Sequence, residues 1–346
     1  MRLRRLGRDG PYVSEITLGT MTWGEQNSEA EAFAQMDLAL DRGINLFDTA
    51  ELYAIPPRAQ TYGATERIIG NWLRSRKCRA RVLIASKVCG PTDWCPHIRG
   101  GKARLNKAQI TAACEASLRR LGTDYIDLYQ VHWPERKTNY FGRRGYVAAD
   151  DGDATPIEET LEALACLVEA GKVRYLGVSN ETPWGLMRYL RHAEQAGLPR
   201  IVSIQNPYNL LNRSFEVGLA EIAERERVPL LAYSPLAFGV LSGKYLKGAK
   251  PAGARLTLFP HYTRYSSPLA NEAVAAYVAL AREFGCDPAQ MALAFVLRQS
   301  FVGSVIIGAT NLDQLRRNIA SADLDLSDEL LARLEEVQAR YPDPCP

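Results

Sequence analysis

Short runs of apolar and β-branched residues recur along the chain, and each run stops abruptly at polar or small residues. Such runs, bounded in this way, are typical of strands. Because nearly every position within them is apolar, they predict strands that are buried on both faces. The eight runs are EITLGTM from Glu15, INLFDTA from Ile44, VLIASKV from Val82, YIDLYQVHW from Tyr125, VRYLGVSN from Val173, IVSIQNPYN from Ile201, VPLLAYSPL from Val228 and SVIIGAT from Ser304.

The segments between the runs have the spacing and the end residues of helices. Ser28 is a capping-type residue at the start of one segment. Asn106 and Gly122 stand at the start and the end of another. Pro156 and Pro183 begin two more, as expected for proline at the first helical position. Strands that alternate with helices predict a parallel sheet.

Eight strand–helix units predict an α/β fold, a closed (β/α)8 TIM barrel formed by residues 1–346 as one domain. A doubly wound nucleotide-binding sheet is the alternative, but it requires a G-x-G-x-x-G motif that the chain lacks. RLRRLGRDGPYVS predicts an N-terminal β-hairpin across one end of the barrel. Long loops are expected after the fourth strand, over residues 132–156, and after the seventh, from Leu236 to about residue 271 and then a helix.

Composition and charge narrow the class of protein. The 346 residues are 47% hydrophobic, and a formal net charge of +3 gives no reason to expect nucleic acid as a partner. No apolar run is long enough to span a membrane, and no secretory segment is recognised. The seven scattered cysteines fit reduced thiols in a cytoplasmic protein. The sequence leaves the oligomeric state open.

Polar residues at the ends of the runs are the candidate active-site residues, because barrels of this kind carry their chemistry at the carboxyl ends of the strands. An ammonium group favours the phenolate of a nearby tyrosine and lowers its pKa, while an aspartate can hold the lysine in place. A histidine can polarise a carbonyl oxygen. Together they predict a general acid, and redox chemistry would require a cofactor as reductant. The candidates are Asp48, Lys87, His132, Asn180, Gln205 and Tyr233, with Tyr53 five residues after Asp48.

Seven motifs, in this order along the chain, resemble those of the aldo-keto reductase family: INLFDTAELY, IASKV, DYIDLYQVHW, GVSN, SIQNPYN, AYSPLAFGVLSGKY and IIGATNLDQLRRN. The resemblance runs from about Leu6 to Asp325 and looks strongest to the bacterial Tas-like branch, near the potassium-channel β-subunits. It implies NADPH-dependent reduction of an aldehyde or ketone, a small carbonyl substrate, and NADPH in preference to NADH. It also implies a catalytic tetrad, with the second member as proton donor: Asp48, Tyr53, Lys87 and His132.

The same resemblance implies the residues that bind the cofactor and the substrate. Many family members grip the 2′-phosphate with a lysine and an arginine where this chain has Gly308 and Gln314, so Lys244 and Arg255 are the remaining basic candidates. The implied positions are Ser179, Asn180 and Gln205 for the nicotinamide carboxamide, Tyr233 for stacking on its ring, Ser234, Leu236, Gly239, Leu241 and Lys244 for the pyrophosphate, Gly308, Thr310, Gln314 and Asn318 for the adenosine end, and Trp23 and Trp133 for the substrate.

Two tyrosines compete for the role of acid. In many relatives the catalytic tyrosine is followed closely by glycine and glutamate, as Tyr62 is in YGATE. The interval of five residues from Asp48 selects Tyr53 instead, because the strand fixes the position of the aspartate. AIPPRAQT is then an exposed insertion whose paired prolines oppose a continuous helix.

Three other motifs carry no function in this interpretation. Cys89, Cys95 and His97 lack the partner pair of a zinc site. Gly100-Gly101-Lys102 does not have P-loop spacing. The basic cluster Arg99, Lys102, Arg104 and Lys107 is expected to be a solvated surface. Two alternative functions stay open, a nucleotide-binding regulatory or redox-sensing subunit with slow turnover and, more remotely, a barrel isomerase with Lys87 as a Schiff-base amine.

Overall fold

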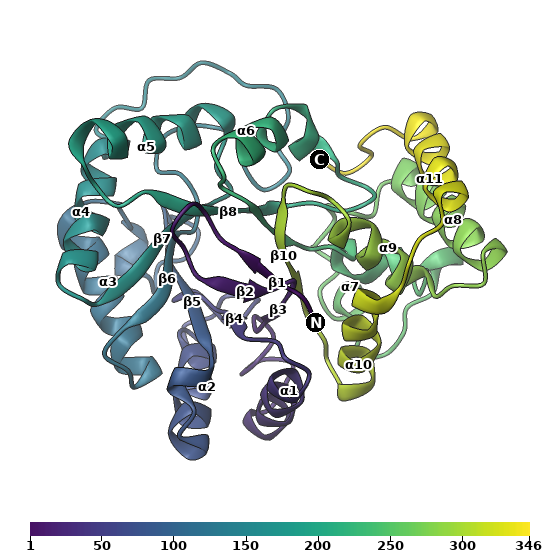
Figure 1. The fold of residues 1–346 in the computed structure, drawn as a ribbon, viewed down its shortest axis with the longest axis horizontal. Coiled ribbons are helices and arrows are strands. Elements are labelled where there is room, and N and C mark those ends of the chain that lie inside the picture. The colour runs from purple at the N-terminus through teal and green to yellow at the C-terminus, as the bar shows by residue number, and fades with distance from the viewer.

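Eight parallel strands close into a barrel in the computed structural model, which describes residues 1–346 (Figure 1). Each strand pairs with its neighbours in chain order, and the last pairs with the first to close the ring. The predicted (β/α)8 barrel and all eight predicted strands are confirmed. The strands are β3 (Ile16–Gly19), β4 (Leu46–Asp48), β5 (Leu83–Val88), β6 (Ile126–Val131), β7 (Val173–Ser179), β8 (Ile201–Pro207), β9 (Leu230–Tyr233) and β10 (Val302–Ile307).

Helices surround the barrel, and α8 and α11 extend it into a second lobe (Figure 1). The helices are α1 (Glu29–Asp41), α2 (Ala64–Arg76), α3 (Lys107–Leu121), α4 (Ile157–Glu169), α5 (Pro183–Ala196), α6 (Leu219–Arg225), α7 (Arg255–Leu258), α8 (Pro268–Glu283), α9 (Pro288–Leu297), α10 (Leu312–Ala320) and α11 (Asp328–Arg340).

The predicted helix ends are confirmed to within one residue, since Pro156 precedes α4 rather than being its first residue. Side-chain caps explain several of these ends. Ser28 forms a capping box with Glu31 at the start of α1. Asn106 accepts a hydrogen bond from the Gln109 amide at the start of α3, and Gly122 ends that helix with φ of 61°. These caps satisfy backbone groups that have no partner inside the helix, so the boundaries follow from the local sequence.

The N-terminal hairpin, β1 (Leu3–Arg5) and β2 (Tyr12–Ser14), crosses one end of the barrel (Figure 1). Leu6 follows β1 and is fully buried in a small apolar cluster inside the barrel with Leu128 and Leu231. Arg4 hydrogen-bonds the Val302 carbonyl at 2.5 Å and the Leu297 carbonyl at 2.6 Å. The hairpin closes this end, so the carboxyl ends of the strands form the open mouth.

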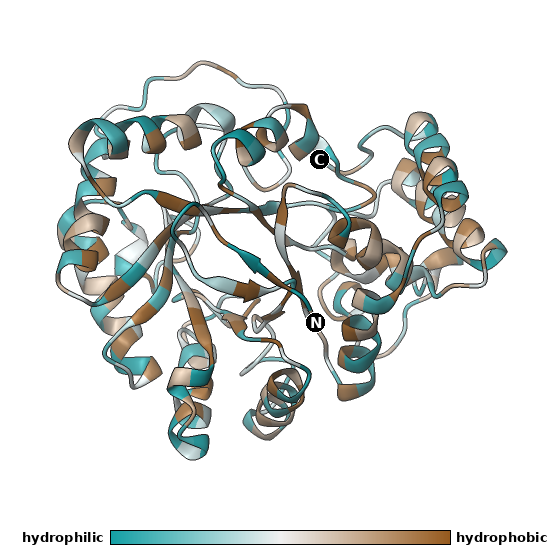
Figure 2. Ribbon diagram, in the orientation of Figure 1, coloured by the Kyte–Doolittle hydropathy of each residue, from teal (hydrophilic) through white to brown (hydrophobic).

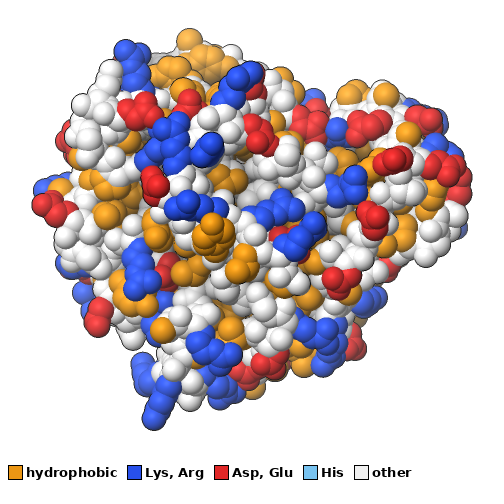
Figure 3. Space-filling model, viewed as in Figure 1, with side chains coloured by type: hydrophobic (Ala, Val, Ile, Leu, Met, Phe, Trp, Pro, Cys, Tyr) orange, Lys and Arg blue, Asp and Glu red, His pale blue; other side chains and the backbone are white.

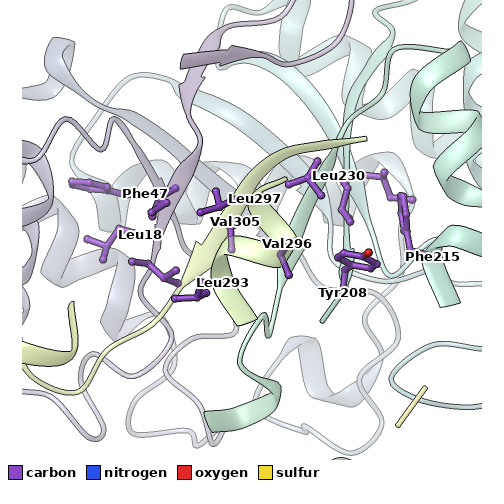
Figure 4. Close-up of a cluster of buried hydrophobic side chains, with 14 of the residues drawn as sticks. Leu18, Phe47, Tyr208, Phe215, Leu230, Leu293, Val296, Leu297 and Val305 are labelled. Atoms are coloured by element: carbon purple, nitrogen blue, oxygen red, sulfur yellow. The ribbon is translucent and has the colours of Figure 1, made fainter. Parts of the chain in front are cut away.

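The main hydrophobic core lies between the strands and the surrounding helices. Apolar residues dominate the strands, while the helices alternate between polar and apolar positions (Figure 2). Figure 4 shows part of this core, where Leu18 and Val305 of the barrel lie near Leu293 and Leu297 of α9. The outer surface around the hairpin carries charges of both signs interspersed (Figure 3).

Both predicted long loops are present, after β6 and after β9. The first contains no helix or strand between Val131 and Ile157. The second differs from the expectation of a single helix, because two helices, α8 and α9, follow it. Gly285, with φ of 67°, interrupts the helical path, and the Asp287 cap then starts α9. No helix of the chain is long and apolar enough to cross a membrane.

Candidate active site

A buried ion pair lies at the mouth of the barrel. Lys87 is fully buried, and its Nζ donates hydrogen bonds to Asp48 Oδ2 and to the Thr49 carbonyl, both at 2.7 Å. The other oxygen of Asp48 accepts a hydrogen bond from Gln205 Nε2 at 2.9 Å and a longer one from Gln130 at 3.4 Å. Both charges are therefore paired and hydrogen-bonded, which is what makes their burial tolerable.

Tyr53 and His132 complete the group that the strand ends predicted. Tyr53 Oη lies 3.5 Å from Lys87 Nζ, and the Lys87 ammonium lies 4.9 Å from the centre of the tyrosine ring. The Tyr53 and His132 rings meet edge to face, with centroids 5.8 Å apart. The structure thus brings the four predicted catalytic residues together at one point.

The pKa of Tyr53 differs from the sequence-based expectation. We expected the Lys87 ammonium to lower it, but burial raises the pKa of Tyr53 well above its ordinary value, and the charge of Asp48 adds to this. Burial is the larger cause, because it disfavours the charged phenolate, and the negative charge of Asp48 disfavours it further. Tyr53 is therefore held as a neutral phenol, which can donate a proton but has little tendency to lose one spontaneously.

His132 is also held neutral. Burial lowers the pKa of His132 well below its ordinary value, and the nearby Lys87 charge lowers it further. Its Nδ1 is buried and has no hydrogen-bond partner within the protein. A neutral imidazole beside a neutral phenol can orient a carbonyl oxygen without competing for its proton.

A cavity of about 1570 Å³ opens above this group. It is larger than the roughly 300–1,000 Å³ typical of sites for drug-sized ligands, so it has room for an extended ligand. Lys87 lies beneath the floor, fully buried. The predicted residues that line the cavity are Asp48, Tyr53, His132, Trp133, Ser179, Asn180, Gln205, Tyr233, Ser234, Leu236, Gly239, Lys244, Arg255, Gly308, Thr310, Gln314 and Asn318.

Two predicted ligand-binding residues do not line the cavity. Trp23 is fully buried in the core, where its Nε1 hydrogen-bonds Gln35 at 3.2 Å. The residues before it, Met21 and Thr22, face the cavity instead. Leu241 is buried against the helices that follow β9. Both are large apolar side chains, and burial decides the direction of such a side chain more than its position in the motif does.

The residues predicted to hold the nicotinamide end already form a connected network. Tyr233 Oη donates a 2.6 Å hydrogen bond to Asn180 Oδ1. Asn180 Nδ2 donates to the His132 carbonyl at 2.9 Å and to Ser179 Oγ at 3.1 Å. Gln205 donates a hydrogen bond from its side-chain amide nitrogen to Asp48. Gln205 therefore connects the residues predicted to bind the cofactor with the buried ion pair.

Two of the cations that line the cavity, Lys244 and Arg255, have no acidic partner. Lys244 forms no ion pair, and its Nζ lies beside Gly239, where an added Cβ would be 2.9 Å from it. Arg255 likewise forms no ion pair, and its guanidinium lies 5.2 Å from the centre of the Phe238 ring. The Gly308 position opens onto free space, so nothing in the chain fills the place where many relatives carry a lysine.

Tyr62 lies outside the cavity, in a second buried ion pair that the sequence did not reveal. Its Oη donates a hydrogen bond to Glu51 Oε2 at 3.1 Å. The Glu51 carboxylate is fully buried and accepts two hydrogen bonds at 2.8 Å from Arg99 and one at 2.7 Å from the Cys89 amide. Burial opposes the ionisation of Glu51, but these partners hold its pKa below its usual range. The sequence did hold a signal for this ion pair. Glu51 lies three residues after Asp48 in a largely apolar stretch, where a charged residue indicates a buried partner.

This ion pair corrects the interpretation of the basic cluster. Arg99 and Arg104 are not solvated surface residues, because Arg99 binds Glu51 and Arg104 binds Glu135, and both carboxylates are buried. Lys102 and Lys107 are exposed, as expected. The loop from Cys89 to Leu105 is therefore anchored by buried charge, which holds Trp94 at the cavity wall.

The Cys95 Sγ atom lies 3.3 Å from His97 Nε2. No third ligand-type side chain joins them, because the structure gathers no group of three or more His, Cys, Asp or Glu suited to a metal ion.

The cavity wall also contains segments that the sequence did not predict. The inserted segment after Tyr53 is exposed at Arg58–Gln60, as expected, but its first residues Ile55, Pro56 and Pro57 line the cavity. The C-terminal residues 344–346 line it as well. No local pattern marks these contacts, since they depend on which distant segments the barrel brings together.

The sequence model of the aldo/keto reductase family matches residues 15–339, which is almost the whole chain. The chain belongs to the aldo-keto reductase family.

Relatives support this assignment over nearly their full lengths. The chain is 56% identical to Protein tas of Escherichia coli strain K12 across all of both proteins. It is 31% identical to the L-glyceraldehyde 3-phosphate reductase of E. coli O157:H7, over 97% of this chain and 92% of that protein. It is 30% identical to a probable voltage-gated potassium channel subunit beta of Arabidopsis thaliana, over 97% and 96%.

The second buried ion pair should be required for stability. We expect Glu51→Gln to lower the free energy of unfolding by about 3 kcal/mol, because it leaves the Arg99 guanidinium largely buried without its counter-charge. Urea denaturation followed by circular dichroism measures this. Asp153→Asn is the matched control, since Asp153 also pairs with an arginine but is 95% exposed; it should change stability by no more than about 0.5 kcal/mol. Equal effects of the two substitutions would contradict the proposed importance of the buried pair.

Proposed function

We propose that this aldo-keto reductase reduces an aldehyde or ketone to the alcohol with NADPH, with Tyr53 as the proton donor. The observation that carries the proposal is the placement of Tyr53 Oη, which lies 3.5 Å from a buried lysine on the wall of a cavity with room for a dinucleotide and a substrate. The four grouped polar side chains match the chemistry that carbonyl reduction requires of the protein.

The residues present fit NADPH. Ser179, Asn180 and Gln205 line the same cavity as Tyr53 and carry amide and hydroxyl groups suited to the carboxamide. Lys244 and Arg255 offer positive charge without an acidic partner, which suits phosphates. When bound there, NADPH supplies the hydride, with its two electrons, that reduces the carbonyl carbon.

The protein's part in the reaction is to place and protonate the oxygen. As the C=O π bond breaks, the oxygen gains charge, and Tyr53 is the neutral phenol next to it that can donate a proton. The Lys87 ammonium stabilises the phenolate that forms, and Asp48 keeps the lysine charged and in place. Neutral His132 orients the carbonyl oxygen from the other side. A proton from solvent then converts the Tyr53 phenolate back to the neutral phenol.

A regulatory or redox-sensing subunit with slow turnover is the second candidate. The resemblance to a probable potassium channel subunit beta supports it, and the same cavity would then hold nucleotide without rapid catalysis. Mixing the protein with NADPH and reactive aldehydes separates the two, because loss of reduced-nicotinamide absorbance reports turnover. Tight NADPH binding without turnover on any aldehyde would favour the regulatory function.

Replacing the two tyrosines tests which of them is the acid. We expect Tyr53→Phe to reduce kcat for carbonyl reduction by about 10²–10⁴-fold, because the proton donor is lost. Tyr62→Phe should leave kcat within about threefold, since Tyr62 bonds Glu51 and does not line the cavity. Steady-state kinetics with both variants measures this. A large loss in Tyr62→Phe with an active Tyr53→Phe would reverse the assignment.

The pKa shifts predict a flat pH profile. A raised pKa keeps Tyr53 protonated throughout the neutral range, and a lowered pKa keeps His132 neutral there. We therefore expect kcat at saturating NADPH to change by less than about threefold between about pH 6 and pH 9. A fall on the acid side near the ordinary pKa of histidine would show that His132 titrates, and a fall between about pH 7 and 9 would show that Tyr53 does.

Lys244 is expected to contribute to the preference for NADPH. We expect Lys244→Gln to raise the Kd for NADPH by about tenfold and the Kd for NADH by much less, because NADH lacks the 2′-phosphate. Fluorescence titration of each nucleotide measures both constants. Lys247→Gln is the control, because Lys247 lies in the same loop but is exposed and outside the cavity. Equal weakening of both nucleotides would place Lys244 on the pyrophosphate instead.

A further inference from the structure

A glutamine inside the barrel has no part in the site described so far. Gln130 is fully buried on β6, in register with Lys87 of β5 on one side and with Gly177 of β7 on the other. Its side chain does not line the cavity, so it can affect a ligand only through its neighbours. A buried polar side chain costs free energy unless it is hydrogen-bonded, and an apolar residue would fill the same space without that cost.

The neighbouring strand leaves room for this side chain. A Cβ added to Gly177 would lie 2.9 Å from Gln130 Cγ and 3.1 Å from Ser203 Oγ. Because the barrel interior is close-packed, a larger residue at position 177 would displace the glutamine. The glycine of β7 and the glutamine of β6 are therefore fitted to each other.

Gln130 contacts both the buried ion pair and the cavity wall. Its Nε2 donates a hydrogen bond to Asp48 Oδ1 at 3.4 Å, and its Oε1 accepts one from Gln205 Nε2 at 3.3 Å. Gln205 Nε2 also donates to Asp48 Oδ1 at 2.9 Å. The three side chains thus form a closed triangle. Both contacts of Gln130 are longer than a typical hydrogen bond, so the effect of losing them should be modest.

The triangle determines which atom of Gln205 is available to a ligand. An amide nitrogen carries two hydrogens, and Gln205 directs its nitrogen to two acceptors within the protein, Asp48 and Gln130. Its Oε1 accepts no hydrogen bond from the protein, and the residue lines the cavity. A single bond to Asp48 would let the plane of the amide turn about that bond, whereas two bonds fix the plane. Gln205 therefore offers a ligand an acceptor in a fixed orientation.

We propose that Gln130 is a positioning residue for the nicotinamide end of the cofactor. It acts through Gln205, because it holds the amide group so that Oε1 can accept a hydrogen bond from the N–H of the carboxamide. This inference rests on the proposed use of NADPH, and it assigns a role in cofactor recognition to a residue that the cofactor does not touch.

The test measures the binding of three ligands to the wild-type protein and to Gln130→Met. Methionine is similar in size, but its thioether is only a weak acceptor and donates no hydrogen bond. NADP⁺ carries the carboxamide, its 3-acetylpyridine analogue has a methyl group in place of the amide nitrogen, and 2′,5′-ADP lacks the nicotinamide altogether. Isothermal titration calorimetry gives the Kd of each.

Only NADP⁺ can donate a hydrogen bond to Gln205, so the substitution should affect NADP⁺ selectively. We expect the wild-type protein to bind NADP⁺ about tenfold more tightly than the acetylpyridine analogue. In Gln130→Met the Kd for NADP⁺ should rise by about three- to tenfold, while the Kd for 2′,5′-ADP stays within about twofold. The preference for NADP⁺ over the analogue should then fall to about threefold or less.

Ser203→Ala is the matched control. Ser203 is also fully buried and next to Gly177, but it does not line the cavity and its Oγ has no hydrogen-bond partner. This variant should keep the preference for NADP⁺. Gln130→Glu tests for rescue, because its side chain keeps an oxygen that can accept from Gln205, and it should retain most of the preference that Gln130→Met loses. Melting curves establish that each variant is folded before its binding is compared.

An unchanged preference in Gln130→Met would overturn the proposal. Equal weakening of all three ligands would also overturn it, because the glutamine would then have a general structural role, and so would a loss in Gln130→Glu as large as that in Gln130→Met. Since these are binding measurements, the expected pattern supports the role of Gln130 even if no aldehyde is reduced, a result that would remove only the proposed catalysis.

Discussion

The buried pair of Lys87 and Asp48 is the interaction on which the rest of the site depends. A fully buried ammonium is tolerable only if its charge is paired and its hydrogen bonds are satisfied. The barrel meets this condition by placing β4 and β5 side by side in parallel, so that the end of one strand delivers the aspartate to the lysine of the next. Because a buried ion pair rarely stabilises a fold relative to apolar packing, its presence here is better explained by chemistry than by stability.

A second layer of buried charge holds the segment that carries Tyr53. Successive residues of a strand point to opposite faces. Lys87 therefore meets Asp48 inside the barrel, while its neighbour Ser86 bonds Glu66 of α2 on the outside. Glu66 in turn pairs with Arg120 of α3, and Glu51 with Arg99. The tyrosine thus lies between an inner ion pair and outer ones, which restrict its position without placing charge of their own in the cavity.

The sequence predicted well whatever depends on short-range pattern. Apolar runs located the eight strands, capping residues located the ends of α1 and α3, and the strand ends supplied Asp48, Lys87 and His132 because a strand fixes where its last side chain points. The predictions from sequence were wrong where residues distant in the chain decide which way a side chain points or what surrounds it. Trp23 and Leu241 turn into the core instead of the cavity, and Arg99 finds a buried carboxylate 48 positions away. The pKa of Tyr53 could not be inferred from the presence of a lysine, since burial and Asp48 outweigh it.

The distribution of charge also depends on contacts between residues that are distant in the sequence. A formal net charge of +3 over the chain suggests little attraction for anions, and many arginines are indeed neutralised by nearby carboxylates. Four cations line the cavity, and none forms an ion pair with an aspartate or glutamate side chain: Lys244, Arg255, Arg264 and Arg317. Since the carboxylates are used elsewhere, the positive potential is concentrated in the cavity, where low-dielectric walls strengthen it. A nearly neutral protein can therefore present a strongly anion-attracting site, and only the pairing of charges in the folded chain reveals it.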